Sequence, residues 1–429
     1  DGSGSVILLE VARILNLAQG RPPVDIYLVW FGSEELGLYG SFHFAATHQE
    51  LLDRTLAMLQ TDMLSRPLDG ISAYLNLVTW SYGRLGDARL AWPDFLQGVV
   101  RGQGVRVEPV DYAGIESDNS ALTGFDVPNA NLIFMNAPAM EEVGGIHYAC
   151  RIHDPYDTIE AAREMGDVLE QMAWVALAAA VETGRDGTPP LRVAPSPDRR
   201  ALFIASHTES VHMAPTTFID LGMALSWEGF DVDMIPYGRT LTAADLDASA
   251  ADLVVVLPVV DYPSPEGDPT LYDEAWTQEE VEVLEAYVSG GGLLVVANSA
   301  HRLKYVNMVL DANEDWIDVN LLAERFGVSY QQGILPSADA TTVGEHPLVR
   351  GVAGLALAEG NGVPFALAES VSGVILAESE GVPAVALLDY GDAGGQVLVL
   401  ADVGILGSQG GEPHNLTFWR NLAEYARSR

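Results

Sequence analysis

The sequence contains a single cysteine, Cys150, and a single lysine, Lys304. One cysteine excludes an internal disulfide and a zinc module built from several cysteines. Apolar runs are short, and none reaches the roughly 18 residues that a membrane-spanning helix needs. Basic residues are scarce, since 22 Lys and Arg stand against 60 Asp and Glu, for a formal net charge of −38. A surface this acidic repels phosphate backbones, which argues against a nucleic-acid partner.

The chain has 429 residues, of which 48% are hydrophobic. At roughly 100–200 residues per domain, this length predicts two or three domains, each with its own apolar core. The acidic balance fits secreted proteins, metal binding or halophily without separating them. The sequence opens with Asp1-Gly-Ser-Gly-Ser and no initiator Met, so we interpret it as a mature or truncated piece.

The first half alternates helix-like and strand-like segments, which predicts a layered α/β domain over residues 1–185. Apolar spacing predicts a helix over 5–18, a buried strand over 25–31, and further strands and helices over 56–63, 131–135 and 167–183. A Pro- and Gly-rich stretch then predicts a linker over 186–199.

Residues 200–429 restart the alternation and predict a second, doubly wound α/β domain. Its expected strands lie at 201–205, 232–235, 253–260 and 292–297, with helices at 214–228 and 277–289 between them. The last part predicts short strands at 373–377, 384–389 and 396–401, followed by a helix at 415–428.

Two adjacent acids, Glu34 and Glu35, directly follow the expected strand at 25–31. Functional sites of α/β proteins lie at the carboxyl ends of strands. Neighbouring side chains diverge there, so one carboxylate can bind a metal while the other removes a proton from water. The alternative is a solvated Glu pair at a helix start, where the helix dipole favours acids.

Three further polar clusters follow along the chain. They are Thr61-Asp62-Met63, Ser117-Asp118-Asn119-Ser120, and the loop that holds His153, Pro155 and Asp157. Asp62 is a candidate oxygen ligand and His153 a candidate nitrogen ligand, with Asp157 placed to orient the imidazole. Helix capping explains the two Asp residues equally well, and a lone His is often structural.

Taken in order, these clusters resemble the co-catalytic zinc aminopeptidases, a superfamily that includes bacterial leucyl aminopeptidases, aminopeptidase Y, glutamate carboxypeptidase and glutaminyl cyclase. The resemblance rests on G-S-E-E-L-G, on an Asp 27 residues after Glu35, on S-D, and on H-x-P-x-D-T. It covers roughly residues 1–185. It implies a mixed sheet flanked by helices, with Glu34 as general base, Glu35 and His153 on one zinc, and Asp62 on the other.

The chain departs from this pattern upstream of the metal cluster. The family's first metal histidine and its bridging aspartate precede the turn that aligns with Ser3 and Gly4, so three of five expected ligands remain. Three explanations stay open: a missing N-terminal segment that exists as a separate chain, an incomplete record of a longer protein, or a degenerate relative. Asn119 also stands where the family has a His beside the aspartate, which leaves the role of Asp118 open.

Residues 200–429 resemble the glutamine-amidotransferase-like, flavodoxin-like domains. The strings behind this resemblance are Y-V-S-G-G-G-L-L-V-V from Tyr287, H-P-L-V-R-G-V from His346, and the closing strand and helix. An active amidotransferase needs a cysteine after the 292–297 strand, but the chain has Asn298, Ser299 and His301 there. We therefore expect binding or assembly from this domain.

Together these observations predict a secreted zinc exopeptidase, an aminopeptidase acting on peptides, with an accessory C-terminal domain. The alternative is a non-catalytic structural or interaction protein that keeps the peptidase fold and forms a homo-oligomer. A cyclase-like transferase is a third reading.

Overall fold

The computed structural model describes residues 2–18, 22–34, 38–64, 74–79, 91–111, 117–125, 127–135, 155, 158–163, 166–185, 199–207, 214–259, 275–299, 315–357, 362–407 and 415–429. The chain forms two units, each made of separate stretches of sequence. The first contains residues 1–34, 53–123 and 127–193, and the second contains residues 35–52, 124–126 and 194–429. The expected linker at 186–199 lies outside the described residues except for Arg199.

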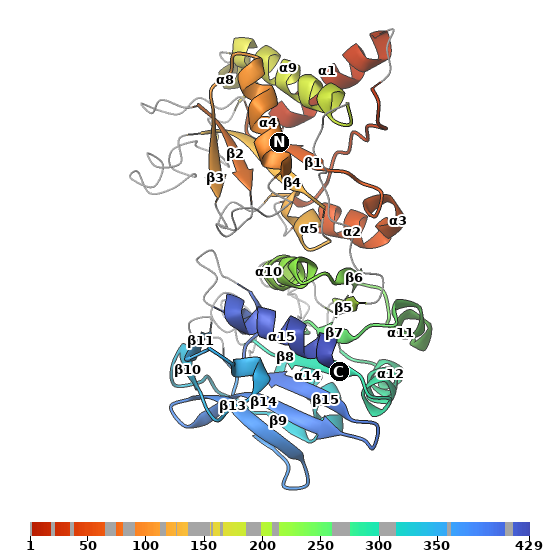
Figure 1. The fold of residues 1–429 in the computed structure, drawn as a ribbon, viewed down its shortest axis with the longest axis vertical. Helices are drawn as coiled ribbons and strands as arrows, with labels where there is room; N and C mark the ends of the chain where they lie inside the picture. Colours follow the sequence, from red (N-terminus) through yellow and green to blue (C-terminus); the bar gives the residue numbers. More distant parts are fainter. Residues whose placement is uncertain are drawn as a thin grey trace. The chain divides into compact units, whose positions relative to one another are not determined.

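The described residues of the first unit form a four-stranded mixed sheet (Figure 1). Its strands lie in the order β1 (Met58–Thr61), β4 (Asn129–Met135), β2 (Tyr74–Thr79), β3 (Val107–Asp111). β1 runs parallel to β4 and β2 parallel to β3, while β2 and β4 are antiparallel. The strand expected at 56–63 and the one expected at 131–135 therefore both belong to this sheet.

Three helices build the apolar core of the first unit. They are α1 (Gly2–Leu17), α4 (Ala91–Gly102) and α9 (Gly166–Glu182). Ile7 and Val11 of α1 and Leu96 of α4 are buried in one cluster with Ala130 and Leu132 of β4. Their spacing along α1 follows the helical period, because residues four apart lie on the same face of a helix. Two short helices, α5 (Ser120–Thr123) and α8 (Ile159–Arg163), complete the described part of this unit.

The strand expected over 25–31 is not formed. Residues 25–31 are extended, with half-buried Ile26 and Leu28 alternating with exposed Tyr27, but they pair with no strand among the described residues. Within the described part of the chain, β4 is the one strand that pairs with β1, so β1 is the edge strand of the described sheet. The N–H of Met58 donates to the backbone oxygen of Pro128, and the N–H of Asp62 donates to that of Leu132. Alternate residues of a strand direct their N–H groups to opposite sides, so the N–H groups of Leu59 and Thr61 point away from β4.

In the second unit, the strands that the structure describes include nine that form one sheet (Figure 1). Five strands form its parallel part in the order β6 (Asp231–Ile235), β5 (Arg200–Ile204), β7 (Leu253–Val256), β8 (Leu293–Ala297), β15 (Gly395–Leu400). All side chains of β7 and β8 are buried. Continuous apolar strands of this kind are typical of a parallel sheet covered on both faces.

An antiparallel extension continues the sheet beyond β15. It consists of β14 (Val382–Tyr390), β13 (Ser372–Ser379), β10 (Asp339–Thr342) and β11 (Gly354–Ala356). A separate two-stranded sheet joins β9 (Val328–Tyr330) to β12 (Phe365–Leu367). The sheet is thus mixed rather than wholly parallel, because the hairpin β13–β14 adds strands that need only a tight turn between them.

Helices connect and cover the parallel strands. They are α10 (Ala214–Trp227), α11 (Ala243–Ser249), α12 (Gln278–Ser289), α14 (Asp315–Ala323) and α15 (Leu416–Ser428). α10 packs against α15, whose Phe418 and Trp419 are fully buried. Residues from early in the chain also belong to this unit, as α2 (Tyr39–Thr47) and α3 (Gln49–Leu52).

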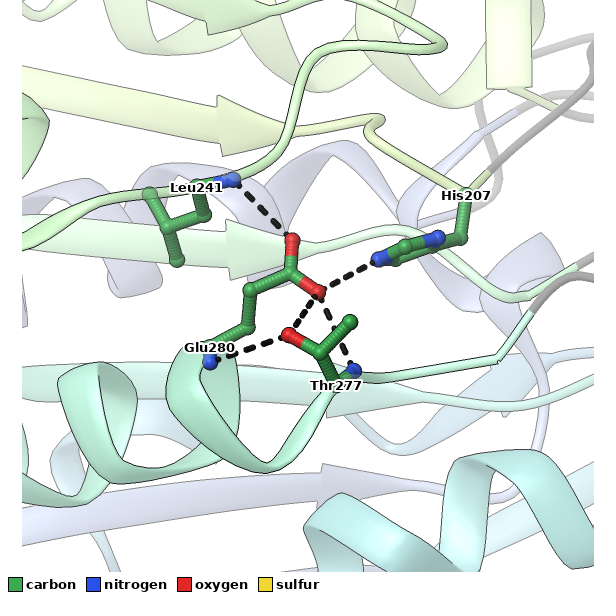
Figure 2. A network of polar contacts seen from close by, with 4 residues as sticks. All are labelled: His207, Leu241, Thr277 and Glu280. Atoms are coloured by element: carbon green, nitrogen blue, oxygen red, sulfur yellow. Dashed lines mark hydrogen bonds and ion pairs between the residues drawn. The ribbon is translucent and has the colours of Figure 1, made fainter.

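A buried carboxylate fastens the start of α12 to the carboxyl end of β5 (Figure 2). Glu280 is fully buried, and its Oε2 lies 2.9 Å from Nε2 of His207. Its Oε1 accepts from the N–H of Leu241 at 3.0 Å, and its Oε2 accepts from the hydroxyl of Thr277 at 2.8 Å. Burial raises the pKa of Glu280, but these hydrogen bonds outweigh burial and lower the pKa to about 2.

Candidate functional site

Asp62 stands at the carboxyl end of β1, as the sequence predicts. The strand forms because Met58 and Leu59 are apolar and its backbone pairs with β4. The N–H of Asp62 donates to the oxygen of Leu132 at 3.2 Å, which fixes the backbone just beyond the strand. The side chain is partly buried. The position fits the general rule that α/β sheets carry their sites at strand carboxyl ends.

A short chain of hydrogen bonds holds the Asp62 carboxylate. The hydroxyl of Ser117 donates to Oδ2 of Asp62 at 3.0 Å, and Nε2 of Gln60 donates to Oγ of Ser117 at 3.2 Å. Gln60 and Asp62 share one face of the strand because side chains two residues apart point the same way. These two hydrogen bonds orient Oδ2 of Asp62, and the other carboxylate oxygen, Oδ1, takes no part in them.

The surroundings of Asp62 disfavour the ionised form of its carboxyl group. Burial raises its pKa, the hydrogen bonds from Ser117 and Met63 lower it, and the charge of Asp118 raises it further, with a net increase. Asp118 is itself buried, with 6% of its surface exposed. Two acids therefore lie near each other where water screens their repulsion poorly.

This environment fits a bound cation. A divalent metal beside Asp62 and Asp118 would offset both the burial of the carboxylates and their mutual repulsion. Carboxylate oxygens, together with the imidazole of His153, are ligands that zinc accepts. Within the ranges that the structure describes, no three His, Cys, Asp or Glu side chains form a metal-binding group.

Two residues beside the candidate site have left-handed backbone conformations. Ser33, directly before Glu34, has φ 59°, and Met63, directly after Asp62, has φ 49°. Neither is glycine, so each conformation costs on the order of 1–2 kcal/mol. Strain of this kind persists only where the surrounding structure holds it, and it is concentrated at functional sites.

The start of α1 is tied to the segment that carries Asp62. The N–H of Leu64 donates to Oγ of Ser3 at 3.0 Å, and Gly4 is buried. Leu64 is fully buried in the same apolar cluster as Ile7. Ser3 and Gly4, aligned with the family's helix start on sequence alone, lie in the first turn of α1, and Ser3 contacts Leu64, two residues after the proposed ligand Asp62.

Only part of the proposed site falls within the described residues. Glu34 is described and partly buried, at the end of the extended segment. Glu35, His153 and Asp157 lie outside the described residues.

The structure gives a role to the residues around Asp118. Nδ2 of Asn119 donates to Oδ1 of Asn129 at the start of β4, at 2.9 Å. Asn129 in turn donates to Oγ1 of Thr123 at 2.9 Å, so the segment is fastened to the sheet. Asn119, which replaces the family's His, is therefore a structural residue in this chain.

Ser117 and Gln60 are the two residues that sequence reasoning did not assign to the site. Ser117 precedes Asp118 in the S-D motif, and Gln60 stands two residues before Asp62. The strand period places Gln60 on the face of Asp62 and was a usable signal. The pairing of Ser117 with Asp62 spans 55 residues and has no local signal.

The polar turn after β8, the place of the amidotransferase nucleophile, contains no cysteine. The N–H of Ser299 donates to the side chain of its neighbour Asn298 at 2.8 Å. His301 lies outside the described residues. In the part of the chain that the structure describes, no helix combines the length and the low polarity needed to cross a bilayer.

Comparison with known proteins gives a family match for the first part of the chain. Residues 1–180 match the profile of Peptidase family M28. Two relatives from Ajellomyces capsulatus, both named Leucine aminopeptidase 1, are 39% (strain NAm1 / WU24) and 37% (strain H88) identical over 67 residues. The matched segment is 15% of this chain and 17% of each relative.

Solved structures are only distantly similar. The mmIFT52 N-terminal domain is 15% identical, with a TM-score of 0.38 over 54% of this chain and 98% of its own. A cytoplasmic protein from Salmonella typhimurium LT2 is 19% identical, with a TM-score of 0.36 over 53% of this chain and 98% of its own. Scores this low assign no fold or function. The supported conclusion is that residues 1–180 are similar to the M28 peptidases.

Proposed function

We propose that this protein is a zinc-dependent exopeptidase, an aminopeptidase that hydrolyses peptide bonds. The observation that carries the proposal is the Ser117–Asp62 pair at the carboxyl end of β1, with Asp118 nearby. It lies inside the region matched by the M28 profile, and fungal leucine aminopeptidases are similar over part of the chain. A peptide substrate and a secreted location follow from the same proposal.

In the proposed site, Glu35, Asp62 and His153 would hold zinc, and Asp157 would orient the imidazole of His153. Zinc supplies Lewis-acid polarisation of the scissile carbonyl when it is bound. Ser117 holds Asp62 in one orientation. Glu34 accepts the proton of the attacking water and passes it to the leaving amine, as a general base and then a general acid.

The open side of β1 and the extended segment 25–31 support a second part of the proposal. Among the described residues β1 pairs on one side only and residues 25–31 belong to no strand, so a strand supplied by a further polypeptide segment could add to this edge. The same segment would supply the remaining zinc ligands that the family resemblance implies. The intact mass of native protein, with any co-purifying smaller chain, tests this point.

We also propose that the second unit is a flavodoxin-like accessory domain. Numbered in chain order, its parallel strands β5, β6, β7, β8 and β15 lie in the order 2-1-3-4-5. This order is the one found in flavodoxin-like sheets. The absence of a cysteine after β8 argues against amidotransferase chemistry in this unit.

The central experiment compares Glu34→Gln with the exposed control Glu369→Gln. Native protein is assayed for zinc content and for hydrolysis of aminoacyl amides. We expect two zinc per protomer, activity in the wild type and in Glu369→Gln, and at least a hundredfold loss of kcat in Glu34→Gln with zinc retained. Native protein that binds no zinc and hydrolyses no amide would instead identify a non-catalytic structural protein, including an oligomeric one.

A further inference from the structure

The H-P-L-V-R-G-V motif lies in the connection between β10 and β11 of the second unit. Its residues Pro347–Val349 form a short 3₁₀ helix, η4, and His346 caps the N-terminus of that helix. The N–H of Leu348 donates to Nδ1 of His346 at 3.2 Å. Pro347 stands at the start of η4, where the N–H that proline lacks has no partner within the helix. The local backbone therefore explains why His and Pro stand next to each other.

η4 is fastened to helix α15 of the same unit. Nδ2 of Asn421 in α15 donates to the backbone oxygens of Leu348 at 3.1 Å and of Arg350 at 2.9 Å. The side chain of Leu348 is fully buried. The ring centroid of His346 lies 5.3 Å from that of Tyr425, one helical turn after Asn421. The cap, the turn and α15 thus form one connected arrangement that holds the chain between β10 and β11.

A histidine differs from the usual caps in that its acceptor atom titrates near neutral pH. Ser, Thr, Asp and Asn are the residues preferred at this position, and His alone changes charge between pH 5 and 8. Nδ1 of His346 accepts a hydrogen bond only while the ring is neutral and carries its proton on Nε2. Protonation places a hydrogen on Nδ1, directly opposite the N–H of Leu348. The charged ring therefore cannot cap η4 in the observed geometry.

Charged and titratable groups surround His346 on three elements. Glu345 and Arg350 are exposed and flank it on its own turn, with opposite charges. The exposed Asp389 lies near the end of β14, and the uncharged phenol ring of Tyr425 faces it from α15. Burial of the imidazole lowers the pKa of His346 below 6.5, and the charge of Asp389 opposes that shift without reversing it. The fold thus favours the neutral ring, which is the form that caps η4.

We propose that His346 is a pH-sensitive cap, which fastens the connection between β10 and β11 to α15 at neutral pH and releases it in mildly acidic solution. Once Nδ1 carries a proton, η4 loses its N-terminal hydrogen bond. The bonds from Asn421 depend on the same backbone geometry, so the cap and the contact with α15 weaken together. Because the folded pKa is lowered, the stabilisation is complete above pH 6.5 and declines as the pH falls below that value. The device lies within the second unit and does not depend on peptidase activity.

Hydrogen exchange of the full-length protein, measured by mass spectrometry at about pH 7.5 and about pH 5.5, tests the proposal. Protection factors, which are corrected for the intrinsic pH dependence of exchange, are compared for peptides that cover residues 343–356. We expect wild-type protection there to fall about three- to tenfold at the lower pH, ten being the limit for a pKa of 6.5 in the released turn. Protection in α12 should stay constant, because Glu280, with a pKa of about 2, remains ionised.

Three variants assign the effect to one side chain. His346→Asn keeps a capping oxygen that does not titrate, so its protection at 343–356 should be the same at both pH values. His43→Asn, at an exposed position of α2, should keep the wild-type response. Asp389→Asn removes the charge that favours the protonated ring, so its loss of protection at about pH 5.5 should exceed that of the wild type.

Two results would overturn the proposal. One is wild-type protection at 343–356 that is equal at both pH values. The other is a loss of protection in His346→Asn as large as that of the wild type. The wild-type comparison and Asp389→Asn decide the matter independently of how well His346→Asn folds.

Discussion

The hydroxyl of Ser117 donates to Oδ2 of Asp62 across 3.0 Å, and the two residues lie 55 positions apart in the sequence. This hydrogen bond favours the charged form of a carboxylate whose burial favours the neutral form. In the proposed site Asp62 is a metal ligand and must be deprotonated to bind, so the hydrogen bond from Ser117 favours the form that binds a cation.

Replacement of Ser117 by alanine tests this relationship. In Ser117→Ala the carboxylate loses its donor, so zinc affinity is expected to fall about 10–100-fold, the range usual for groups that orient a ligand. Equilibrium dialysis at pH 7 measures the change, with the exposed Ser428→Ala as control. Unchanged affinity in Ser117→Ala would show that Asp62 is not a metal ligand.

The buried pair of Glu280 and His207 predicts the acid stability of the protein. The pKa of Glu280 is lowered from 4.5 to about 2 in the fold, so the folded state releases its proton more readily than the unfolded state does. The stabilisation that follows from this lowered pKa is about 3 kcal/mol; it is complete above pH 4.5 and is lost as the pH falls toward 2. Thermal melts of the wild type and Glu280→Gln should converge over this window.

A neighbouring residue provides the control for that measurement. Glu279 precedes Glu280 in the first turn of α12 but is exposed. Glu279→Gln should therefore reproduce the wild-type pH profile. A parallel loss of stability in both variants would assign the effect to general charge rather than to the pair in Figure 2.

The hydrogen bonds of the Tyr330 hydroxyl are expected to stabilise the second unit. This hydroxyl is fully buried and donates to the oxygens of Leu400 at 2.8 Å and Val296 at 3.3 Å, which joins β9 to the carboxyl ends of β15 and β8. Tyr330→Phe should lower the free energy of unfolding by about 1–2 kcal/mol. Tyr425→Phe removes a partly buried bond to Gln396 and should cost less, which urea denaturation can compare.

Removal of residues 194–429 should prevent the rest of the chain from folding normally. The ring of Phe218 in α10 contacts the rings of Phe42 and Phe125, so its loss would expose the aromatic surface of both. A chain of residues 1–193 is expected to bind the dye ANS and to elute as aggregates in size-exclusion chromatography. A monomeric, dye-free fragment would show that segments 38–52 and 124–125 fold without α10.

The sequence allowed prediction of those elements that have a strong local pattern. The helical period of 5–18 and the β-branched run at 253–256 correspond to α1 and β7. The strand expected at 25–31 has an equally strong pattern, but a strand needs a partner, and none is present among the described residues. β2 and β3 were not anticipated, because Asn76 and Pro109 interrupt their apolar runs.

The sequence allowed candidate site residues to be named, but it did not allow their contacts with one another to be predicted. Asp62 was identified from its place after a strand and from the family resemblance. Its donor Ser117 and the meeting of Phe42 with Phe125 on Phe218 depend on chain segments more than 50 residues apart. Such contacts leave no periodic signal, because they are set by how whole elements pack.

The edge of β1 that no described strand covers also bears on how this protein behaves at high concentration. An open strand edge is a template onto which an identical chain can add, and such stacking leads to insoluble fibres. Mutual repulsion between molecules of net charge −38 opposes the approach at neutral pH. That colloidal protection disappears near the isoelectric point of about 4.3, where precipitation should begin.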